Sequence, residues 1–347
     1  MKTKRIVICG LGNVGKSFIK LVAERVDRVR AKHGLNIEIA GVVDIGGAAV
    51  ASEGTLPLDE LIAFLQSGGR PEHFPGYGRP GLTGAEVISS NALDILVETT
   101  PTNLKNGEPG RGFIEAAIKA GMDVVSANKG PFVLYFDALQ KMAADHNSRL
   151  FISAATGAAL PTLDVGKFST VGAEITAIEG ILNGTTNFIL TKMALEKSTY
   201  ADALKEAQAM GIAETDPTLD VEGYDTRNKL VLISNTLFAT RFGIADVPVR
   251  GITQVTYADI EQAALDGKVL KLVATAEIKD GKQVSLSVEP KCIDKTHPLA
   301  AINLSEKGIT YTTDTMGQIT IFGGKSSPVG AAAALLKDVI HTHMFSA

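Results

Sequence analysis

The sequence predicts an α/β protein that combines a doubly wound parallel sheet with a second, mixed α+β domain. Short apolar runs alternate regularly with helical patterns over the first 153 residues, as they do where helices connect parallel strands. A glycine-rich turn separates the first apolar run from the first helix. Further along, short alternating strands are separated by Asp-Gly, Gly and Gly-Gly turns, which is typical of antiparallel pairing.

We expect the first domain to cover residues 1–153. Its first three elements form a βαβ unit whose helix ends in cationic residues followed by Gly34, as helix ends favour. The Gly- and Pro-rich segment 67–84 is expected to be an irregular surface excursion. The expected elements, in order, are strand 4–9, helix 14–31, strand 37–43, helix 58–66, strand 93–98, helix 112–120, strand 123–126, helix 136–146 and strand 149–153.

The second domain is expected to cover residues 154–324, to bind the substrate and to form dimer contacts. A last helix, about 325–341, is expected to pack back on the first domain because its apolar part needs a partner surface. An exposed mixed sheet in the second domain also needs a partner, so we expect a homodimer. The other expected elements are strand 174–184, helices 188–195 and 200–210, a helix that begins near Tyr224, and strands 284–290, 308–313 and 318–322.

Composition and charge exclude several classes of protein. Apolar residues make up 45% and charged residues 21% of the 347 residues, which fits a folded globular chain and excludes a disordered or fibrous one. The formal net charge of -4 offers no polybasic face for nucleic acid or an anionic membrane. No apolar stretch approaches the ~20 residues of a membrane span, and the start lacks a signal-peptide cleavage site. We therefore expect a cytoplasmic protein whose partner is a small-molecule substrate.

The two cysteines, Cys9 and Cys292, can pair in principle, but Cys9 stands in an apolar strand. We therefore expect two buried free thiols in a reducing compartment. The spacing of the six histidines matches no zinc site. The last two, His341 and His343, are expected to lie in a frayed terminus.

Residues 10–15 fit the pattern G-x-G-x-x-G. The motif follows a strand at once and opens a helix, which is the context that the pyrophosphate of a dinucleotide requires. Glycines permit the tight turn and let backbone amides approach the phosphates, while the helix dipole places partial positive charge there. The alternative is a strand-to-helix turn without a ligand. The motif favours a Rossmann-type dinucleotide-binding domain, and its residues are Gly10, Leu11, Gly12, Asn13, Val14 and Gly15.

Polar residues also follow the ends of later strands. Asp44 ends the second strand, where a carboxylate accepts hydrogen bonds from the adenosine ribose and repels a 2′-phosphate. NAD is therefore favoured over NADP, and the alternative is that Asp44 caps a helix or turn. Thr99, Thr100 and Lys129 follow two further strands, at the edge that faces the nicotinamide half of the cofactor in such sheets.

An acidic segment leads to a lysine at the start of an apolar helix. Asp225 and Lys229 are four residues apart, so they share one helix face. The alternative is a solvated i,i+4 ion pair, but the carboxylates stand on a Pro- and Gly-containing loop and the helix after Lys229 is strongly apolar. A lysine at the edge of a core suits a proton donor. The acidic residues are Glu214, Asp216, Asp220, Glu222 and Asp225.

The stretch Asn183-Gly184-Thr185 follows an expected strand and combines a tight turn with side-chain hydrogen-bonding groups. A turn followed by a helix cap explains the same residues, so the chemistry of these residues leaves a structural and a functional interpretation open.

The chain resembles the homoserine dehydrogenases over nearly its whole length, and the last two of five matching blocks are highly specific. The blocks are GLGNVG at 10–15, SANKGP at 126–131, TGAALP at 156–161, GILNGTTNFIL at 180–190 and AQAMGIAETDPTLDVEGYDTRNKL at 207–230. The resemblance implies an NAD(P)-dependent oxidoreductase that reversibly reduces L-aspartate 4-semialdehyde to L-homoserine, on the route to threonine, methionine and isoleucine. We expect the reaction to take place in the crevice between the two domains.

The resemblance also implies roles for individual residues. Lys229 matches the lysine regarded as the proton donor, and Asp225 matches the acid beside it. Lys129 matches a lysine that helps to hold substrate and cofactor, and which of the two lysines protonates the substrate stays open. The residues implied in substrate binding are Glu214 and Asp220, which match carboxylates that bind the ammonium group, together with Asn183, Gly184 and Thr185.

Members of the family also carry a monovalent cation, usually sodium, held by backbone carbonyls. The corresponding residues are Ser153, Thr156, Ala158 and Leu160. Ser153 replaces a frequent glutamate of the family, and the turn at 325–327 replaces a Gly-Ala-Gly turn that contacts the cofactor. The sequence ends without a regulatory ACT-type domain, so feedback inhibition by threonine through such a domain is not expected.

Two other functions fit parts of the sequence. The first is a two-domain NAD(P)-dependent dehydrogenase that acts on another amino acid or semialdehyde, which an assay with alternative substrates distinguishes. The second is a nicotinamide-binding regulator without turnover. That function predicts a basic DNA- or protein-binding module, which the sequence lacks.

Overall fold

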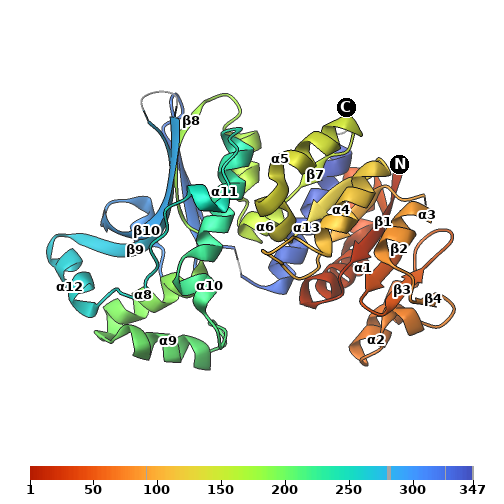
Figure 1. Ribbon diagram of the computed structural model, residues 1–347, viewed down its shortest axis with the longest axis horizontal. Helices are drawn as coiled ribbons and strands as arrows, with labels where there is room; N and C mark the ends of the chain where they lie inside the picture. Colours follow the sequence, from red (N-terminus) through yellow and green to blue (C-terminus); the bar gives the residue numbers. More distant parts are fainter. Residues whose placement is uncertain (91, 280–282, 325, 346–347) are drawn as a thin grey trace. The chain divides into compact units, whose positions relative to one another are not determined.

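The structure is a computed structural model that describes residues 1–90, 92–279, 283–324 and 326–345. The chain forms two compact units (Figure 1), Met1–Ala159 with Ser327–Ala347, and Leu160–Ser326. The expected division after residue 153 lies a few residues before the boundary between these units. Lys325, in the turn that departs from the family pattern, lies outside the described residues. Within the described ranges, no helix combines the length and the apolar character needed to cross a membrane.

In the described part of the chain, the first unit is built on a seven-stranded sheet in the order β4-β3-β2-β1-β5-β6-β7. The strands from β2 to β7 in this order pair in parallel, which confirms the predicted parallel sheet. At one edge β3 pairs antiparallel with β2 and β4 antiparallel with β3, and these two strands were not predicted. The bounds are β1 (Lys2–Cys9), β2 (Leu35–Asp44), β3 (Gly47–Val50), β4 (Gly78–Pro80), β5 (Ile95–Glu98), β6 (Asp123–Ser126) and β7 (Leu150–Phe151).

The segment 67–84 is more ordered than its composition suggests. It contains β4 and a 3₁₀ turn, η1 (Pro71–His73). β3 and β4 have only four and three residues, too few for an alternating pattern, and they join the sheet edge through main-chain hydrogen bonds. The expectation of an irregular excursion was therefore wrong for the residues of β4.

Helices connect the strands of the first unit. α1 ends at Gly34, which adopts the left-handed conformation with a φ of 64°, as the sequence predicts. The C-terminal helix α13 packs against α1, where Leu335 and Val339 lie in one core with Phe18. The bounds are α1 (Asn13–His33), α2 (Leu58–Gln66), α3 (Gly84–Ser90), α4 (Gly110–Lys119), α5 (Gly130–Asp145), α6 (Ser153–Gly157) and α13 (Pro328–Met344).

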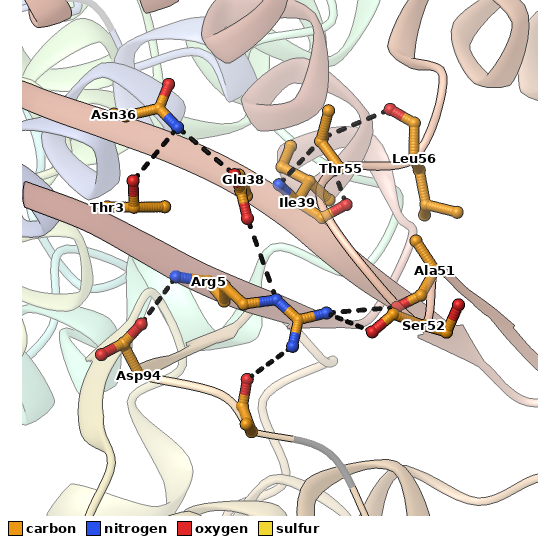
Figure 2. A network of polar contacts seen from close by, with 11 residues as sticks. Thr3, Arg5, Asn36, Glu38, Ile39, Ala51, Ser52, Thr55, Leu56 and Asp94 are labelled. Carbon is orange, nitrogen blue, oxygen red and sulfur yellow. Dashed lines mark hydrogen bonds and ion pairs between the residues drawn. The ribbon is translucent and has the colours of Figure 1, made fainter.

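A polar network lies along the amino-terminal half of β1 (Figure 2). The main-chain N–H of Arg5 donates to the Asp94 carboxylate at 2.8 Å. The guanidinium of Arg5 donates to the carbonyls of Ala51 and Ser52, both at 3.2 Å, and its Nε lies 3.9 Å from Glu38 on β2. The network fastens two connecting loops to the sheet, away from the glycine-rich turn that follows β1.

Two expectations about single residues were wrong. Cys9 is buried in β1, but Cys292 is exposed, because it faces outward on the edge strand β10 while its neighbour Ile293 faces inward. Both cysteines are free. His341 and His343 lie within α13 rather than in a frayed terminus, and a ring nitrogen of His343 is 3.1 Å from the main-chain carbonyl of His33.

The described part of the second unit contains a five-stranded antiparallel sheet in the order β10-β9-β8-β11-β12. This arrangement confirms a second domain of mixed α and β structure, although the strand β9 was not predicted. Its buried stretch includes Lys271, and this charged residue interrupts the apolar run by which a buried strand is predicted. The expected Asp-Gly turn at 280–281 lies outside the described residues. The bounds are β8 (Ile175–Ile181), β9 (Lys268–Lys279), β10 (Gln283–Asp294), β11 (Gly308–Thr313) and β12 (Gln318–Phe322).

Two helices of the second unit carry most of the predicted substrate-site residues. α8 begins after Asn183, whose side chain caps it, and α11 begins at Tyr224, as predicted. The helical segments are α7 (Thr162–Asp164), η2 (Val165–Ser169), α8 (Gly184–Glu196), α9 (Tyr200–Ala209), α10 (Thr218–Val221), α11 (Tyr224–Leu237), η3 (Ile244–Asp246), α12 (Tyr257–Leu265) and η4 (Pro298–Ala301).

Candidate active site

The three glycines of the 10–15 motif have different surroundings. Gly10 has a φ of +98°, and a Cβ there would lie 2.7 Å from the main-chain N of Thr100. A Cβ on Gly15 would lie 2.1 Å from the carbonyl oxygen of Gly10. A Cβ on Gly12 would meet none of the neighbouring described atoms within 4 Å. The first and third glycines are therefore required by the fold, while the space beside Gly12 admits a ligand, as in a dinucleotide-binding turn.

The rest of the motif presents the start of α1 to solvent. Leu11 is buried and Val14 packs against the core, while Gly12 and Asn13 are exposed. Gly12 provides no side-chain cap, and the first turn of α1 contains no acidic residue. Main-chain N–H groups at a helix start, without a carboxylate to satisfy them, bind phosphate readily. The residues present therefore fit the pyrophosphate of a dinucleotide.

Asp44 lies at the carboxyl end of β2, on the same edge of the sheet as the glycine motif. Its side chain is exposed, and Oδ1 accepts a hydrogen bond from the main-chain N–H of Ile45 at 3.0 Å. This bond resembles the turn cap that the sequence offered as an alternative. The second carboxylate oxygen is available for ribose hydroxyls, so the two interpretations are compatible.

A buried carboxylate, Glu98, organises the end of β5 and was not singled out in the sequence. It is completely buried, and it accepts hydrogen bonds from the Thr100 N–H and the Ser126 hydroxyl, both at 2.8 Å. The Thr100 hydroxyl also donates to it. Asn128 Nδ2 lies 3.4 Å from the same carboxylate and 3.2 Å from the Thr100 hydroxyl. Glu98 thus joins the ends of β5 and β6.

Burial raises the pKa of Glu98, and the hydrogen bonds from Thr100, Ser126 and Asn128 oppose that rise. The network fixes the turn after β5, on which the glycine motif rests. The Thr99 hydroxyl donates to the Gly10 carbonyl at 2.7 Å. A glutamate at the end of an otherwise apolar strand is the sequence signal that could have identified this network.

Lys129 directly follows the network, at the start of α5. It is half-buried and immediately precedes Gly130, whose N–H donates to the Asn128 side chain at 2.9 Å. The Glu98 network therefore determines where the main chain of Lys129 lies. Thr99, Thr100 and Lys129 all belong to the first compact unit, together with the glycine motif.

In the second unit, Lys229 and Asp225 form an ion pair on α11. The ammonium nitrogen lies 2.6 Å from Asp225 Oδ2, and each side chain is 15% exposed. The ammonium also donates to the main-chain carbonyl of Leu182 at 2.9 Å. One partner on α11 and one in the connection between β8 and α8 therefore fix the direction of the lysine side chain, which distinguishes it from a solvated helix pair.

Asn183 links this pair to a second carboxylate. Its Nδ2 donates to Asp220 at 2.6 Å and to Asp225 at 3.0 Å. Its Oδ1 accepts from the Thr186 N–H at 3.0 Å and caps α8. Both interpretations therefore apply to Asn183: its Oδ1 caps α8, and its Nδ2 joins the two carboxylates.

Asp220 stands in an electrostatically unfavourable position. Burial raises its pKa, the negative charge of Asp225 raises it further, and hydrogen bonds from Asn183 and Thr185 together with the charge of Lys229 oppose the rise. The Thr185 hydroxyl also donates to the Ile212 carbonyl at 3.1 Å. Asp220 is half-buried, and a partly desolvated carboxylate with a raised pKa beside a like charge attracts a cationic group.

Not every acidic residue of the predicted segment joins this cluster. Glu214 is exposed, and its main-chain carbonyl accepts a hydrogen bond from Gln208 at 3.1 Å. Asp216 is exposed and accepts from Thr218, which lowers its pKa. The structure brings Asp220, Asp225, Asn183 and Lys229 together, and it leaves Glu214 outside this set.

The residues implied in cation binding surround α6. The Ser153 hydroxyl donates to the buried Asp338 at 2.9 Å, and its main-chain N–H donates to the same carboxylate at 3.1 Å. The carbonyl of Ser153 accepts from the Thr156 hydroxyl at 3.0 Å. Ala158 has a φ of 52°, and Leu160 is the first residue of the second unit. Main-chain carbonyl oxygens suit a monovalent cation, and a carbonyl that accepts one hydrogen bond, as that of Ser153 does, has a second lone pair.

Known proteins resemble this chain over nearly its whole length. A family model described as homoserine dehydrogenase matches residues 161–340. The chain is 34% identical to the NAD(+)-dependent homoserine dehydrogenase of Pseudomonas canavaninivorans over 343 residues, or 99% of this chain and 97% of the relative. It is 36% identical to the homoserine dehydrogenase of Methanocaldococcus jannaschii, over 97% of this chain and 98% of the relative.

A solved structure has the same fold. The putative homoserine dehydrogenase of Archaeoglobus fulgidus superimposes with a TM-score of 0.86 at 32% identity, covering 98% of this chain and 99% of that one. Two features of this chain are typical of dinucleotide-dependent oxidoreductases. The first is a glycine-rich turn that leads into a helix without a side-chain cap, and the second is a lysine oriented by a carboxylate. The matches in sequence and structure identify one family within this class of enzymes. The chain belongs to the homoserine dehydrogenase family.

Proposed function

We propose that this protein is an NAD-dependent homoserine dehydrogenase that reversibly reduces L-aspartate 4-semialdehyde to L-homoserine. The proposal rests above all on the position of Lys229, held between a carboxylate at 2.6 Å and a carbonyl at 2.9 Å. The names of relatives that match nearly the full chain support the same reaction. Homoserine is an intermediate for threonine, methionine and isoleucine, so the protein would serve their biosynthesis.

The residues of the second unit account for substrate binding and proton transfer. Asp220 would bind the ammonium group of the substrate, because a half-buried carboxylate with a raised pKa gains from a cationic partner. Glu214 lies outside this cluster, and only the family resemblance supports a part for it in binding the ammonium group. Gly184 and Thr185 would provide hydrogen-bonding groups at the start of α8. Lys229 would deliver a proton to the carbonyl oxygen as the aldehyde becomes an alcohol, and Asp225 would orient it.

The residues of the first unit account for cofactor binding. The amides at the start of α1 would bind the pyrophosphate, and Thr99 and Thr100 would contact the nicotinamide half. When bound, the nicotinamide ring supplies the hydride for reduction or accepts it in the reverse reaction. Lys129 would help to hold substrate and cofactor.

We propose NAD rather than NADP as the preferred cofactor. The exposed carboxylate of Asp44 supports this choice, because it would repel the 2′-phosphate of NADP. The dependence on NAD(+) named for the relative from Pseudomonas canavaninivorans is consistent with it.

Three further properties are proposals. A monovalent cation such as sodium would bind the carbonyls of Ser153, Thr156, Ala158 and Leu160, and replacing sodium salts by tetramethylammonium salts would then lower activity. The 12-residue edge strand β10 of the second sheet supports a homodimer, which analytical ultracentrifugation would measure. The two free thiols support a cytoplasmic location.

The direct test is an assay of the purified protein for reduction of NAD with L-homoserine, in parallel with L-aspartate and L-malate. The proposal predicts turnover with L-homoserine and at least a hundredfold lower kcat/KM with the other two. Faster turnover with another amino acid or semialdehyde would favour a different two-domain dehydrogenase. Binding of NAD without turnover on any substrate would favour a nicotinamide-binding regulator.

A further inference from the structure

A buried lysine lies on the five-stranded sheet of the second unit, outside the cluster of Asn183, Asp220, Asp225 and Lys229. Lys271 on β9 is 3% exposed. Its ammonium donates to the Asn187 side chain at 3.0 Å, the Ile302 carbonyl at 2.5 Å and the Asn303 side chain at 3.1 Å. Three acceptors match the three N–H groups of an ammonium. Burial lowers the pKa of Lys271 to about 8.

The acceptors of Lys271 define a loop, residues 302–306, that is attached to α8. Asn187 on α8 donates to the carbonyls of Ile302 and Glu306, at 3.2 Å and 3.1 Å. The N–H of Leu304 donates to the Thr191 hydroxyl on the same helix at 3.1 Å. Leu304 has a φ of 53°, a conformation that costs a residue of this type free energy and needs support from its surroundings.

The same loop touches the first residue of α8. A Cβ on Gly184 would lie 2.7 Å from the carbonyl oxygen of Ser305, so only glycine lets the loop approach so closely. Gly184 directly follows Asn183, the residue whose amide joins Asp220 and Asp225. A continuous series of contacts therefore runs from Lys271 through the 302–306 loop to the start of α8.

We propose that Lys271 is a positioning residue for substrate binding, acting through the 302–306 loop to fix Asn183 and the carboxylates that Asn183 joins. This inference rests on the proposed function, because it assigns substrate binding to that cluster. Stability alone does not explain a cation at this position, since apolar residues in such places are often equally stable or more stable. A directional ammonium orders three specific acceptors, which an apolar side chain cannot do.

The test compares Lys271→Met, which keeps side-chain length and removes the charge, with the wild-type enzyme. We expect the KM for L-homoserine to rise at least tenfold while the KM for NAD stays within twofold. Lys279→Met is the matched control, because Lys279 is exposed on the same strand, and it should leave both constants unchanged. Equal changes in both KM values, or an unchanged KM for homoserine in a folded Lys271→Met variant, would overturn the proposal.

A milder variant covers the case in which Lys271→Met does not fold. Asn303→Ala removes one acceptor from an exposed position, and we expect it to raise the KM for homoserine about threefold without changing that for NAD. An unchanged KM for homoserine would then overturn the proposal.

Hydrogen exchange separates this inference from the proposed function, because it needs no turnover. In Asn303→Ala, the amides of residues 184–187 and 302–306 should exchange at least threefold faster, while those of β11 keep their rates. Unchanged exchange at the start of α8 would overturn the inference even if homoserine is turned over. Faster exchange there in a protein that turns over another substrate would support the positioning of Asn183 and contradict only the proposed function.

Discussion

Lys229 and Asp225 lie one helical turn apart on α11, with the ammonium 2.6 Å from the carboxylate. An exposed pair at this spacing stabilises a helix by only about 0.3 to 0.5 kcal/mol. Here both side chains are largely shielded from water, and the Leu182 carbonyl is a second acceptor for the ammonium. The pair therefore orients the lysine more than it stabilises the helix, which is the arrangement that a proton donor requires.

The glycine motif predicts opposite effects for two single substitutions. Gly15→Ala places a methyl group against the Gly10 carbonyl, so it should cost roughly 1 to 3 kcal/mol of the free energy of unfolding. Gly12→Ala meets open space and should cost less than about 1 kcal/mol, yet it should weaken NAD binding at least tenfold. Thermal unfolding and NAD titration measure the two effects. Normal NAD affinity in Gly12→Ala would contradict the assigned pyrophosphate position.

Asp44 predicts the choice between cofactors. Asp44→Ala removes the carboxylate that would bind the ribose and repel a 2′-phosphate. We expect the KM for NAD to rise roughly tenfold and the KM for NADP to fall, so that the ratio of kcat/KM values moves toward NADP. Asp59→Ala, at an exposed position on α2, is a suitable control with the same change in charge. A ratio that does not move would show that another group selects the cofactor.

We expect a single substitution, Asp220→Asn, to raise the stability of the fold and to weaken substrate binding. Its pKa is raised in the folded chain, so the folded state binds more protons than the unfolded state between the ordinary pKa of 3.8 and the raised one. The free energy of unfolding therefore falls as pH rises through that window, and the full cost is present above the raised pKa. Asp220→Asn should remove this cost.

We expect Asp220→Asn to raise the melting temperature at pH 7 by roughly 2 to 4 °C. The gain should shrink as the pH is lowered toward 3.8, and the KM for homoserine should rise at least tenfold. Calorimetry at several pH values and steady-state kinetics measure these changes. A lower melting temperature at pH 7 would mean that the carboxylate stabilises the fold.

The two cysteines predict different reactivities. Cys9 is buried, and burial together with the nearby Glu98 raises the pKa of its thiol far above the ordinary value, whereas Cys292 is exposed. Because the thiolate is the reactive form, a disulfide reagent should titrate one thiol rapidly in the folded protein and the second only after unfolding. Cys292→Ser should abolish the rapid phase. Two rapid thiols in the wild-type protein would contradict the burial of Cys9.

The sequence predicted those parts of the fold that rest on strong local signals. The bounds of α2, β6, β11 and β12 agree with the predictions, because each element has a clear pattern between turn residues. The strands β3 and β4 are too short to carry a pattern. β9 has a lysine within its buried stretch, and only the structure shows the three acceptors that make this burial acceptable.

The residues of the candidate site also differ in whether the sequence alone could identify them. The glycine motif and the i,i+4 pair on α11 are local in sequence, so spacing alone could identify them. The Glu98 network joins residues 28 positions apart, and Asn183 reaches carboxylates 37 and 42 positions away. Such contacts arise from the pairing of strands and the packing of helices, which one sequence does not encode in a readable pattern.

The central claim is that Lys229 is the proton donor. The most direct test compares the steady-state kinetics of Lys229→Ala and Lys129→Ala, with Lys205→Ala on the exposed face of α9 as the control. The account predicts that Lys229→Ala lowers kcat about 10² to 10⁴-fold in a folded protein, and that Lys129→Ala mainly raises the KM values. Loss of substrate affinity alone in Lys229→Ala, with turnover abolished in Lys129→Ala, would contradict it.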